Sequence, residues 1–145
     1  TTKIISEKLS KIGAENILEC IKIIEEGNSK FVEQDHDQAT YAKKIDKEES
    51  QINWAESSSV ILAKINALNP FPGAWFKFKG SRYKIWKATN SEKKGTCGEI
   101  LDKELTVGCG KKSIKILEIQ KEGKNKLSVK EFLIGNKIIK GNKIS

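Results

Sequence analysis

The sequence predicts an α+β protein that is mainly β in its second part, and two changes of pattern along the chain carry this prediction. Apolar residues recur at helical spacing in residues 7–26 and again between residues 57 and 68. From Ala74 onward the period of alternation changes to two, and several short strand patterns follow with glycine-containing turns between them. This series indicates a small OB-like barrel of about five to six strands, preceded by a long helix, a linker and a short helix.

The first helix is expected over residues 7–26, with Ser6 as its N-cap and Gly27-Asn28 as its stop. Its apolar residues form one stripe: Leu9, Ile12, Ile17, Ile21 and Ile24. The polar segment that follows offers no surface on which this stripe could be buried. Residues 1–27 are therefore interpreted as the end of a domain whose remainder the chain does not contain, and residues 28–45 as a linker.

The second domain is expected over residues 46–145, and it begins with helical signals. Asp46 and Glu49 have the spacing of a capping box, which predicts a short helical turn. Ser57 or Ser58 caps a second helix that runs to Leu68, and the next residues, Asn-Pro, end it because proline cannot continue the hydrogen-bond ladder. Further along the chain, Ser128 is expected to cap a short helix over residues 129–134.

A β-hairpin is predicted over residues 75–87, with its turn at Gly80-Ser81. Alternation places Phe76, Phe78, Tyr83 and Ile85 on the core side. The opposite side then carries Trp75, Lys77, Lys79, Arg82, Lys84 and Trp86. Three more strands are expected, at residues 98–101, 105–109 and 113–120.

Charge is divided unevenly along the chain. Residues 1–56 carry 8 lysines and 12 acidic residues, a net charge of −4, whereas residues 57–145 carry 19 basic and 7 acidic residues, a net charge of +12. This separation suggests that the second part meets a polyanion. The basic side of the hairpin fits that role because its cations can bind phosphates and its tryptophans can contact bases or sugars. The alternative is an ordinary solvated face whose tryptophans are packed under a neighbouring helix.

The sequence offers no catalytic or metal centre. The single histidine, His36, lies in the linker without a partner, and Cys20, Cys97 and Cys109 are too widely spaced for a zinc site, so we expect buried free thiols. The run 108–113, Gly-Cys-Gly-Lys-Lys-Ser, lacks the glycine spacing of a phosphate loop and is interpreted as a basic turn. No membrane span or secretory signal is visible, and the absence of methionine indicates a fragment.

Several segments resemble the methionyl-tRNA formyltransferase family, in the family's order and over nearly the whole chain. Residues 39–54 are similar to its linker-to-second-domain junction, and residues 69–75, Asn-Pro-Phe-Pro-Gly-Ala-Trp, to its Asn-Pro-aromatic-Pro-Gly-Ala-Trp turn. Residues 83–88 resemble the strand that follows this turn, and residues 7–27 the final helix of the family's catalytic domain. Ile119-Gln120 and Phe132-Leu133 resemble its closing strand and last helix.

The resemblance implies a role in translation initiation. The family transfers a formyl group from 10-formyltetrahydrofolate to the methionine of initiator methionyl-tRNA, using an Asn/His/Asp set in an N-terminal Rossmann-like domain. No counterpart of that set is present, so this portion is expected to be inactive alone, to bind no cofactor, and to act as a monomer in the cytoplasm or an organellar matrix. The basic residues expected to contact the tRNA are Lys43, Lys44, Lys77, Lys79, Arg82, Lys84, Lys87, Lys111, Lys112 and Lys124.

Two positions depart from the family pattern, since Lys43 stands where proline is frequent and Asn66 where arginine is frequent. The first change adds a cation to the linker, and the second removes one from the helix before the turn. Two other interpretations stay open. The chain could be a free-standing basic module that binds nucleic acid, or the C-terminal domain of a formyltransferase acting on nucleotide sugars or folate.

Overall fold

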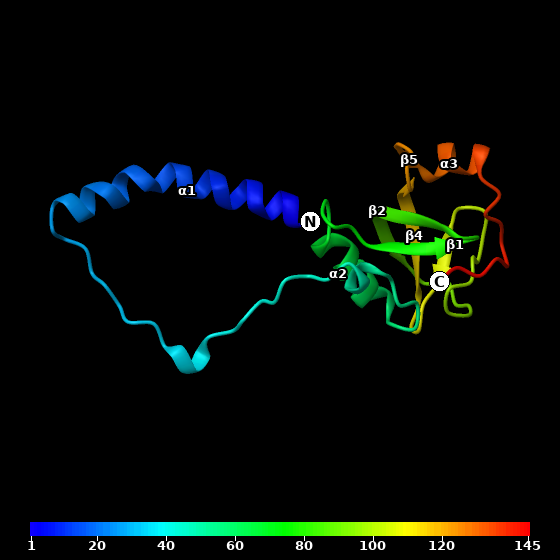
Figure 1. Ribbon diagram of the computed structural model, residues 1–145, viewed down its shortest axis with the longest axis horizontal. Coiled ribbons are helices and arrows are strands. Elements are labelled where there is room, and N and C mark those ends of the chain that lie inside the picture. Colours follow the sequence, from blue (N-terminus) through cyan, green and yellow to red (C-terminus); the bar gives the residue numbers. More distant parts are fainter. The chain divides into compact units, whose positions relative to one another are not determined.

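The computed structural model describes all 145 residues, and their contacts divide the chain into two compact units. The helix unit comprises Lys3–Ile45, and the sheet unit comprises Asp46–Ser145 together with Thr1 and Thr2. Figure 1 shows the elements of both units. Each unit has its own internal packing and is described by itself.

The helix unit consists of helix α1 (Thr2–Glu25) and a polar segment with one short 3-10 helix, η1 (His36–Gln38). The predicted helix is confirmed, but Ser6 lies inside it rather than at its N-cap, because nothing in the preceding residues interrupts helical backbone. No residue of α1 is buried, and its predicted apolar stripe is 44% to 62% exposed. The helix therefore has an apolar face that nothing in its unit covers.

The sheet unit opens with two helical elements. The 3-10 helix η2 (Glu48–Ser50) occupies the predicted short turn, but no side chain caps it, so the capping box expected at Asp46 is wrong. Helix α2 (Ser58–Ala67) begins at its predicted cap, where the Ser57 hydroxyl accepts a hydrogen bond from the backbone amide of Val60. Its apolar stripe points into the core, since Ile61 and Ile65 are fully buried.

Five antiparallel strands follow, of which four lie close to predicted strands and the last was not predicted. The strands are β1 (Trp75–Phe78), β2 (Ser81–Ser91), β3 (Thr106–Gly108), β4 (Ser113–Lys121) and β5 (Lys126–Ser128). Their order is β1-β2-β4-β3, and β5 also pairs with β4. Helix α3 (Val129–Gly135) then begins with a complete capping box between Ser128 and Glu131.

The turn of the first hairpin is one residue earlier than predicted. Lys79 and Gly80 form it with φ values of 47° and 77°, and Ser81 already pairs with Phe78. Two successive residues with positive φ are typical of the type I′ turn, whose twist matches that of the adjoining strands. Lys79 is therefore a turn residue and does not continue the row of side chains on β1.

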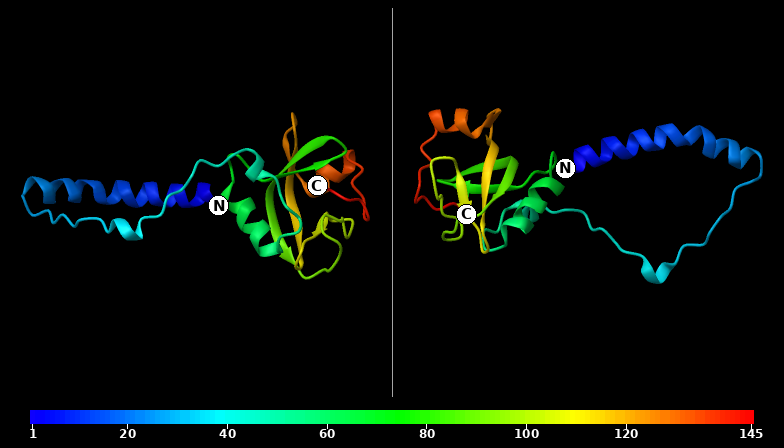
Figure 2. Two further views of the ribbon diagram at one scale, coloured as in Figure 1. Left: turned by 60° about the horizontal axis from the view of Figure 1, so that its bottom comes forward. Right: turned by 180° about the vertical axis from the view of Figure 1, so that it is seen from behind.

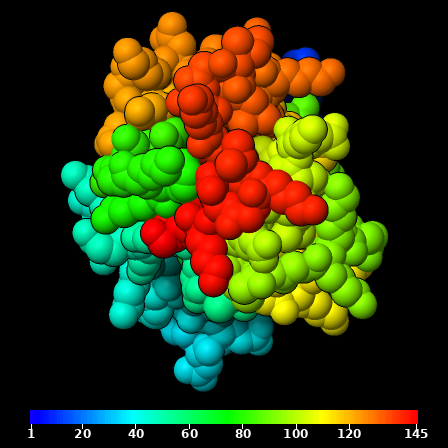
Figure 3. Space-filling model, turned by 90° about the vertical axis from the view of Figure 1, so that its right-hand side faces the viewer, coloured from blue at the N-terminus to red at the C-terminus, as the bar shows by residue number.

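The strands do not close into the predicted barrel, because the sheet ends at β1 on one side and at β3 on the other. The segment expected to be a strand at residues 98–101 forms only isolated bridges. The C-terminal segment lies in this gap, between the hairpin and the β2–β3 connection (Figure 3). There the Ser145 amide donates to the Lys77 carbonyl, and the Ile144 amide to the Gly98 carbonyl at 2.9 Å. Irregular backbone thus joins the two sheet edges where a strand was expected.

The core lies between the curved sheet and the two helices. The four hairpin residues predicted to face inward are all buried, and Phe76 stacks on Tyr83 with a centroid distance of 5.4 Å. Helix α2 packs on β2, whereas α3 packs on β4 and β5 at the opposite end of the sheet (Figures 1 and 2). No helix of the chain has the length and apolar character that crossing a bilayer requires.

Candidate functional site

The outer side of the β1–β2 hairpin carries aromatic and basic side chains in one row. Trp75 pairs with Lys84 across the two strands, and Lys77 pairs with Arg82. Residues directly opposite in an antiparallel pair lie on the same face, and this face is the one turned away from Phe76 and its neighbours. We call the resulting surface the hairpin face, and its members are Trp75, Lys77, Arg82, Lys84 and Trp86.

The cations of the hairpin face lie over indole rings. The guanidinium carbon of Arg82 is 4.4 Å from the centroid of Trp75, and the Nζ of Lys77 is 5.8 Å from it. The Nζ of Lys84 lies 4.5 Å from the centroid of Trp86. A ring face attracts a cation without neutralising its charge. None of these three cations forms an ion pair with a carboxylate.

Trp86 and Lys84 are also held by hydrogen bonds to neighbouring elements. The indole N–H of Trp86 donates to the Oε1 of Gln120 on β4 at 2.9 Å, and the Nε2 of Gln120 donates to the Lys124 carbonyl at 2.7 Å. The Nζ of Lys84 donates to the Pro70 carbonyl at 3.0 Å. Burial lowers the pKa of Lys84 from its ordinary value. Both side chains are thus positioned before any ligand arrives, which reduces the entropy lost on binding.

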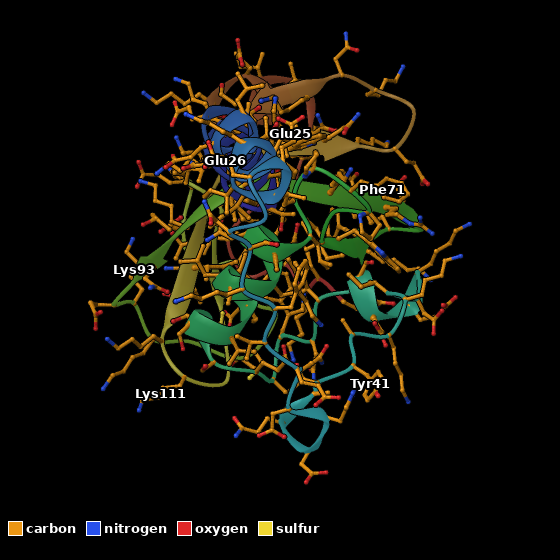
Figure 4. All side chains as sticks on the ribbon, turned by 90° about the vertical axis from the view of Figure 1, so that its left-hand side faces the viewer. Glu25, Glu26, Tyr41, Phe71, Lys93 and Lys111 are labelled. Carbon is orange, nitrogen blue, oxygen red and sulfur yellow. The ribbon has the colours of Figure 1, made fainter.

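An open cavity of about 230 Å³ lies on the hairpin face, and its lining residues are Pro72, Gly73, Trp75, Arg82, Lys84, Gln120 and Glu122. Gly73 is required at its edge, because its φ is +88° and a Cβ there would lie 1.7 Å from the Cε of Lys84. Phe71, in the turn before β1, is 86% exposed. In Figure 4 it projects on the side of the sheet unit opposite Lys93 and Lys111.

The other residues predicted to bind RNA do not all join this surface. Lys124 lies in the β4–β5 turn beside Gln120, and Lys79 lies in the hairpin turn with its Nζ 5.3 Å from the Phe78 ring. Lys87 is exposed at an irregularity of β2 and pairs in register with Glu118. Lys111 and Lys112 lie in the β3–β4 turn, and Lys43 and Lys44 belong to the helix unit. Three of the ten predicted cations, Lys77, Arg82 and Lys84, therefore lie on the hairpin face, and Lys124 lies beside it.

Lys112 differs from the hairpin cations because a carboxylate pairs with it. Its Nζ lies 2.8 Å from the Oε1 of Glu92, and the same distance separates Lys126 from Glu118. Lys126 also lies 5.6 Å from the Trp86 centroid, so it borders the hairpin face. Sequence patterns missed Lys126, Gln120 and Glu122, because β2 and β4 bring together residues that are 34 to 40 positions apart.

The remaining chemistry of the chain is sparse. His36 is exposed in η1, and no group of three His, Cys, Asp or Glu side chains is arranged to hold a metal ion. The expectation of buried thiols is correct for Cys109, whose pKa burial raises to about 11, and wrong for Cys20 and Cys97, which are exposed. A raised pKa keeps a thiol protonated and unreactive. The hairpin face is the feature best suited to bind a ligand.

The chain is similar to one protein family over the sheet unit and to members of that family over nearly its whole length. Residues 44–137 match the family model described as formyl transferase, C-terminal domain. The chain is 47% identical over 142 residues to the methionyl-tRNA formyltransferase of Pelagibacter ubique (strain HTCC1062), covering 97% of this chain and 46% of that relative. It is 43% identical over 138 residues to the methionyl-tRNA formyltransferase of Carboxydothermus hydrogenoformans, covering 92% and 45%. The chain thus spans about half the length of these relatives.

A solved structure shares the fold at lower identity. HypX from Aquifex aeolicus, in complex with tetrahydrofolic acid, superposes with a TM-score of 0.67 at 23% identity. The match covers 88% of this chain and 24% of that one. The architecture therefore recurs as part of longer polypeptides.

Proposed function

Because this chain belongs to the formyl transferase C-terminal domain family, we propose that it is the tRNA-binding portion of a methionyl-tRNA formyltransferase. The observation that carries the proposal is the hairpin face, where three cations lie on indole rings and none is neutralised by a carboxylate. Uncompensated cations at fixed positions on a sheet suit the phosphates of a folded RNA. The tRNA is preferred to a nucleotide sugar or free folate because the cations extend along a surface.

The hairpin face would hold the tRNA mainly through its backbone. Contacts to phosphates set the position and orientation of a nucleic acid but carry little sequence information. The planar guanidinium of Arg82 can donate two parallel hydrogen bonds to one phosphate, whereas Lys77 and Lys84 act as point charges. The expected role is therefore to position the acceptor end of initiator methionyl-tRNA.

The helix unit supports a place for this chain within a longer enzyme. The exposed apolar stripe of α1 suits the last helix of a Rossmann-like catalytic domain, and the polar residues 28–45 suit a linker between that domain and residues 46–145. In this proposal the catalytic domain transfers the formyl group from 10-formyltetrahydrofolate to the methionine amino group. The sheet unit, with its open antiparallel sheet, contributes binding and no catalytic residue. The whole enzyme would act as a monomer in the cytoplasm or an organellar matrix.

The test is the binding of the 145-residue chain to methionyl-tRNA at increasing salt concentration. Each phosphate neutralised releases counterions, so log K should fall linearly with log salt, with a slope of roughly −0.7 to −0.9 per contact. Several contacts predict a slope of several units. An affinity that does not depend on ionic strength, or no binding at low salt, would contradict the proposal and favour a formyltransferase that acts on a small molecule.

A further inference from the structure

The cavity on the hairpin face has a chemical composition that a phosphate site would not need. Besides Arg82 and Lys84 it contains a carboxylate, Glu122, and a primary amide, Gln120. A carboxylate repels phosphate, and it accepts hydrogen bonds from N–H groups. The cavity therefore combines groups that suit the base of a nucleotide with cations that suit its phosphate.

The carboxylate of Glu122 is held in place and keeps one acceptor available. Its Oε1 accepts a hydrogen bond from the backbone amide of Arg82 at 2.9 Å, while no hydrogen bond or ion pair engages its Oε2. This backbone contact joins the β4–β5 turn to β2 across 40 residues of sequence. The free oxygen belongs to a fixed side chain, so it can select a donor by its position.

The flat groups needed to hold a base are also present. The Arg82 guanidinium lies over Trp75, so it offers a planar cation, and Phe71 provides an exposed ring in the turn that leads to the cavity edge at Gly73. RNA-binding proteins hold unpaired bases between such planes and contact the base edges by hydrogen bonds. Lys84, bound to the Pro70 carbonyl, supplies a cation at the same edge for the attached phosphate.

We propose that this cavity is a subsite for one unpaired nucleotide whose base carries an exocyclic amino group. The Oε2 of Glu122 accepts a hydrogen bond from that amino group, the base lies against the Arg82 guanidinium, and Lys84 contacts the phosphate. The subsite rests on the proposed function, since it adds one contact to a base within the surface that is proposed to bind the tRNA backbone. It adds a selectivity that phosphate contacts alone do not provide.

The test uses two single-stranded probes that differ only in the groups on the pyrimidine edge. Tetracytidylate and tetrauridylate have the same charge and length, but cytosine carries an amino group at the position where uracil carries an oxygen. The intact chain should bind tetracytidylate about tenfold more tightly, as expected for one base-edge contact. Glu122→Gln keeps an oxygen to accept from Arg82 but loses the charge, and its preference should fall to within about twofold.

The matched control is Glu118→Gln, which removes a β4 carboxylate that pairs with Lys126 and does not line the cavity. It should keep the full preference for cytidine. Equal binding of the two probes by the intact chain would overturn the subsite, and so would a preference that survives in Glu122→Gln. Methionyl-tRNA binding is measured separately with the same proteins, so a failure to bind tRNA would overturn the proposed function while the probe series still tests the cavity.

Discussion

Lysines occur throughout the sheet unit, but the two halves of the sheet use them differently. On the hairpin face, Lys77, Arg82 and Lys84 lie on aromatic rings and have no carboxylate partner. Around β3 and the turns beside it, three lysines pair with acids at 2.6 to 2.8 Å: Lys93 with Asp102, Lys112 with Glu92 and Lys115 with Glu104. The comparison shows that the net charge of the sheet unit overestimates the number of cations that are available to bind a polyanion. The three cations of the hairpin face present charge that no carboxylate accompanies, whereas Lys93, Lys112 and Lys115 do not.

Reversing the charge of two lysines on each half should distinguish binding at the hairpin face from an effect of the overall net charge. Lys77→Glu combined with Lys84→Glu removes two cations from the hairpin face, and methionyl-tRNA affinity should fall by about 100-fold at moderate salt. Lys112→Glu combined with Lys115→Glu changes the net charge equally at two lysines that carboxylates already accompany, and should cost only a few-fold. Electrophoretic mobility or anisotropy assays measure both. Equal losses from the two double variants would show that overall charge, rather than the hairpin face, controls binding.

Asp102, on the paired half, is expected to stabilise the fold rather than to affect tRNA binding. Burial raises the pKa of Asp102, but hydrogen bonds donated by the Lys93 ammonium and by the backbone amides of Thr106 and Glu104 outweigh that effect and hold its pKa well below the ordinary value. A carboxylate with a lowered folded-state pKa stabilises the fold above its unfolded-state pKa, and this contribution is lost as pH falls toward the folded-state value. Asp102→Asn should therefore lower the unfolding free energy by about 1–3 kcal/mol at pH 7.

Urea unfolding at several pH values measures this contribution. The difference between the intact chain and Asp102→Asn should shrink as pH falls from about 5 to about 2, because the carboxylate is increasingly protonated in the unfolded chain. The control is Glu104→Gln, whose exposed pair with Lys115 should contribute less than about 1 kcal/mol. Neither variant should change tRNA affinity by more than about twofold. A large loss of tRNA binding in Asp102→Asn would contradict the division between the two halves.

Gly73→Ala should disturb the unpaired half without changing any charge. The new Cβ would lie 1.7 Å from the Cε of Lys84, which must then leave its place beside the Pro70 carbonyl. The expected results are a loss of stability of about 1 kcal/mol from the strained backbone and a tRNA affinity about fivefold lower. Gly80→Ala has a similarly positive φ of +77° but meets nothing within 4 Å, so it isolates the backbone strain. If both variants bound tRNA equally, the position of Lys84 would be irrelevant.

The same contrast explains which features the sequence could predict. The inward row of Phe76, Tyr83 and Ile85 follows from alternation within one hairpin, where the neighbours are also close in sequence. The basic row opposite is predicted for the same reason. Whether a lysine is paired depends on contacts between distant segments, as Lys112 and Glu92 show at a separation of 20 residues. The sequence therefore could not show that Lys112, one of the residues predicted to bind RNA, is accompanied by a carboxylate.

Closure of the sheet was unpredictable on similar grounds. Residues 98–101 bond to β3 on one side, where the Leu101 amide donates to the Thr106 carbonyl, and to the irregular C-terminal segment on the other, where the Ile100 amide donates to the Asn142 carbonyl. They therefore form only isolated bridges. The cavity residues Gln120 and Glu122 likewise gain their role from the pairing of β2 with β4. Local periodicity cannot identify such partners, because it carries no information about which strands pair with one another. The apolar stripe of α1 shows the same limit, since the stripe predicts a helix but does not identify the surface against which that helix packs.

The smallest expected effect is on the salt dependence of binding. The slope of log K against log salt reports the number of phosphate contacts rather than the affinity. Arg82→Gln removes a cation whose donors are free, so the slope of log K against log salt should become shallower by roughly 0.7–0.9, the value for one phosphate. Lys112→Gln removes a cation that Glu92 already accompanies, and its slope should stay within experimental error of the intact chain. Titrations from low to moderate salt with methionyl-tRNA measure both slopes. If Lys112→Gln changed the slope as much as Arg82→Gln, ion pairing would not distinguish the two halves, and the charge of the whole sheet unit would have to be assigned to the RNA surface.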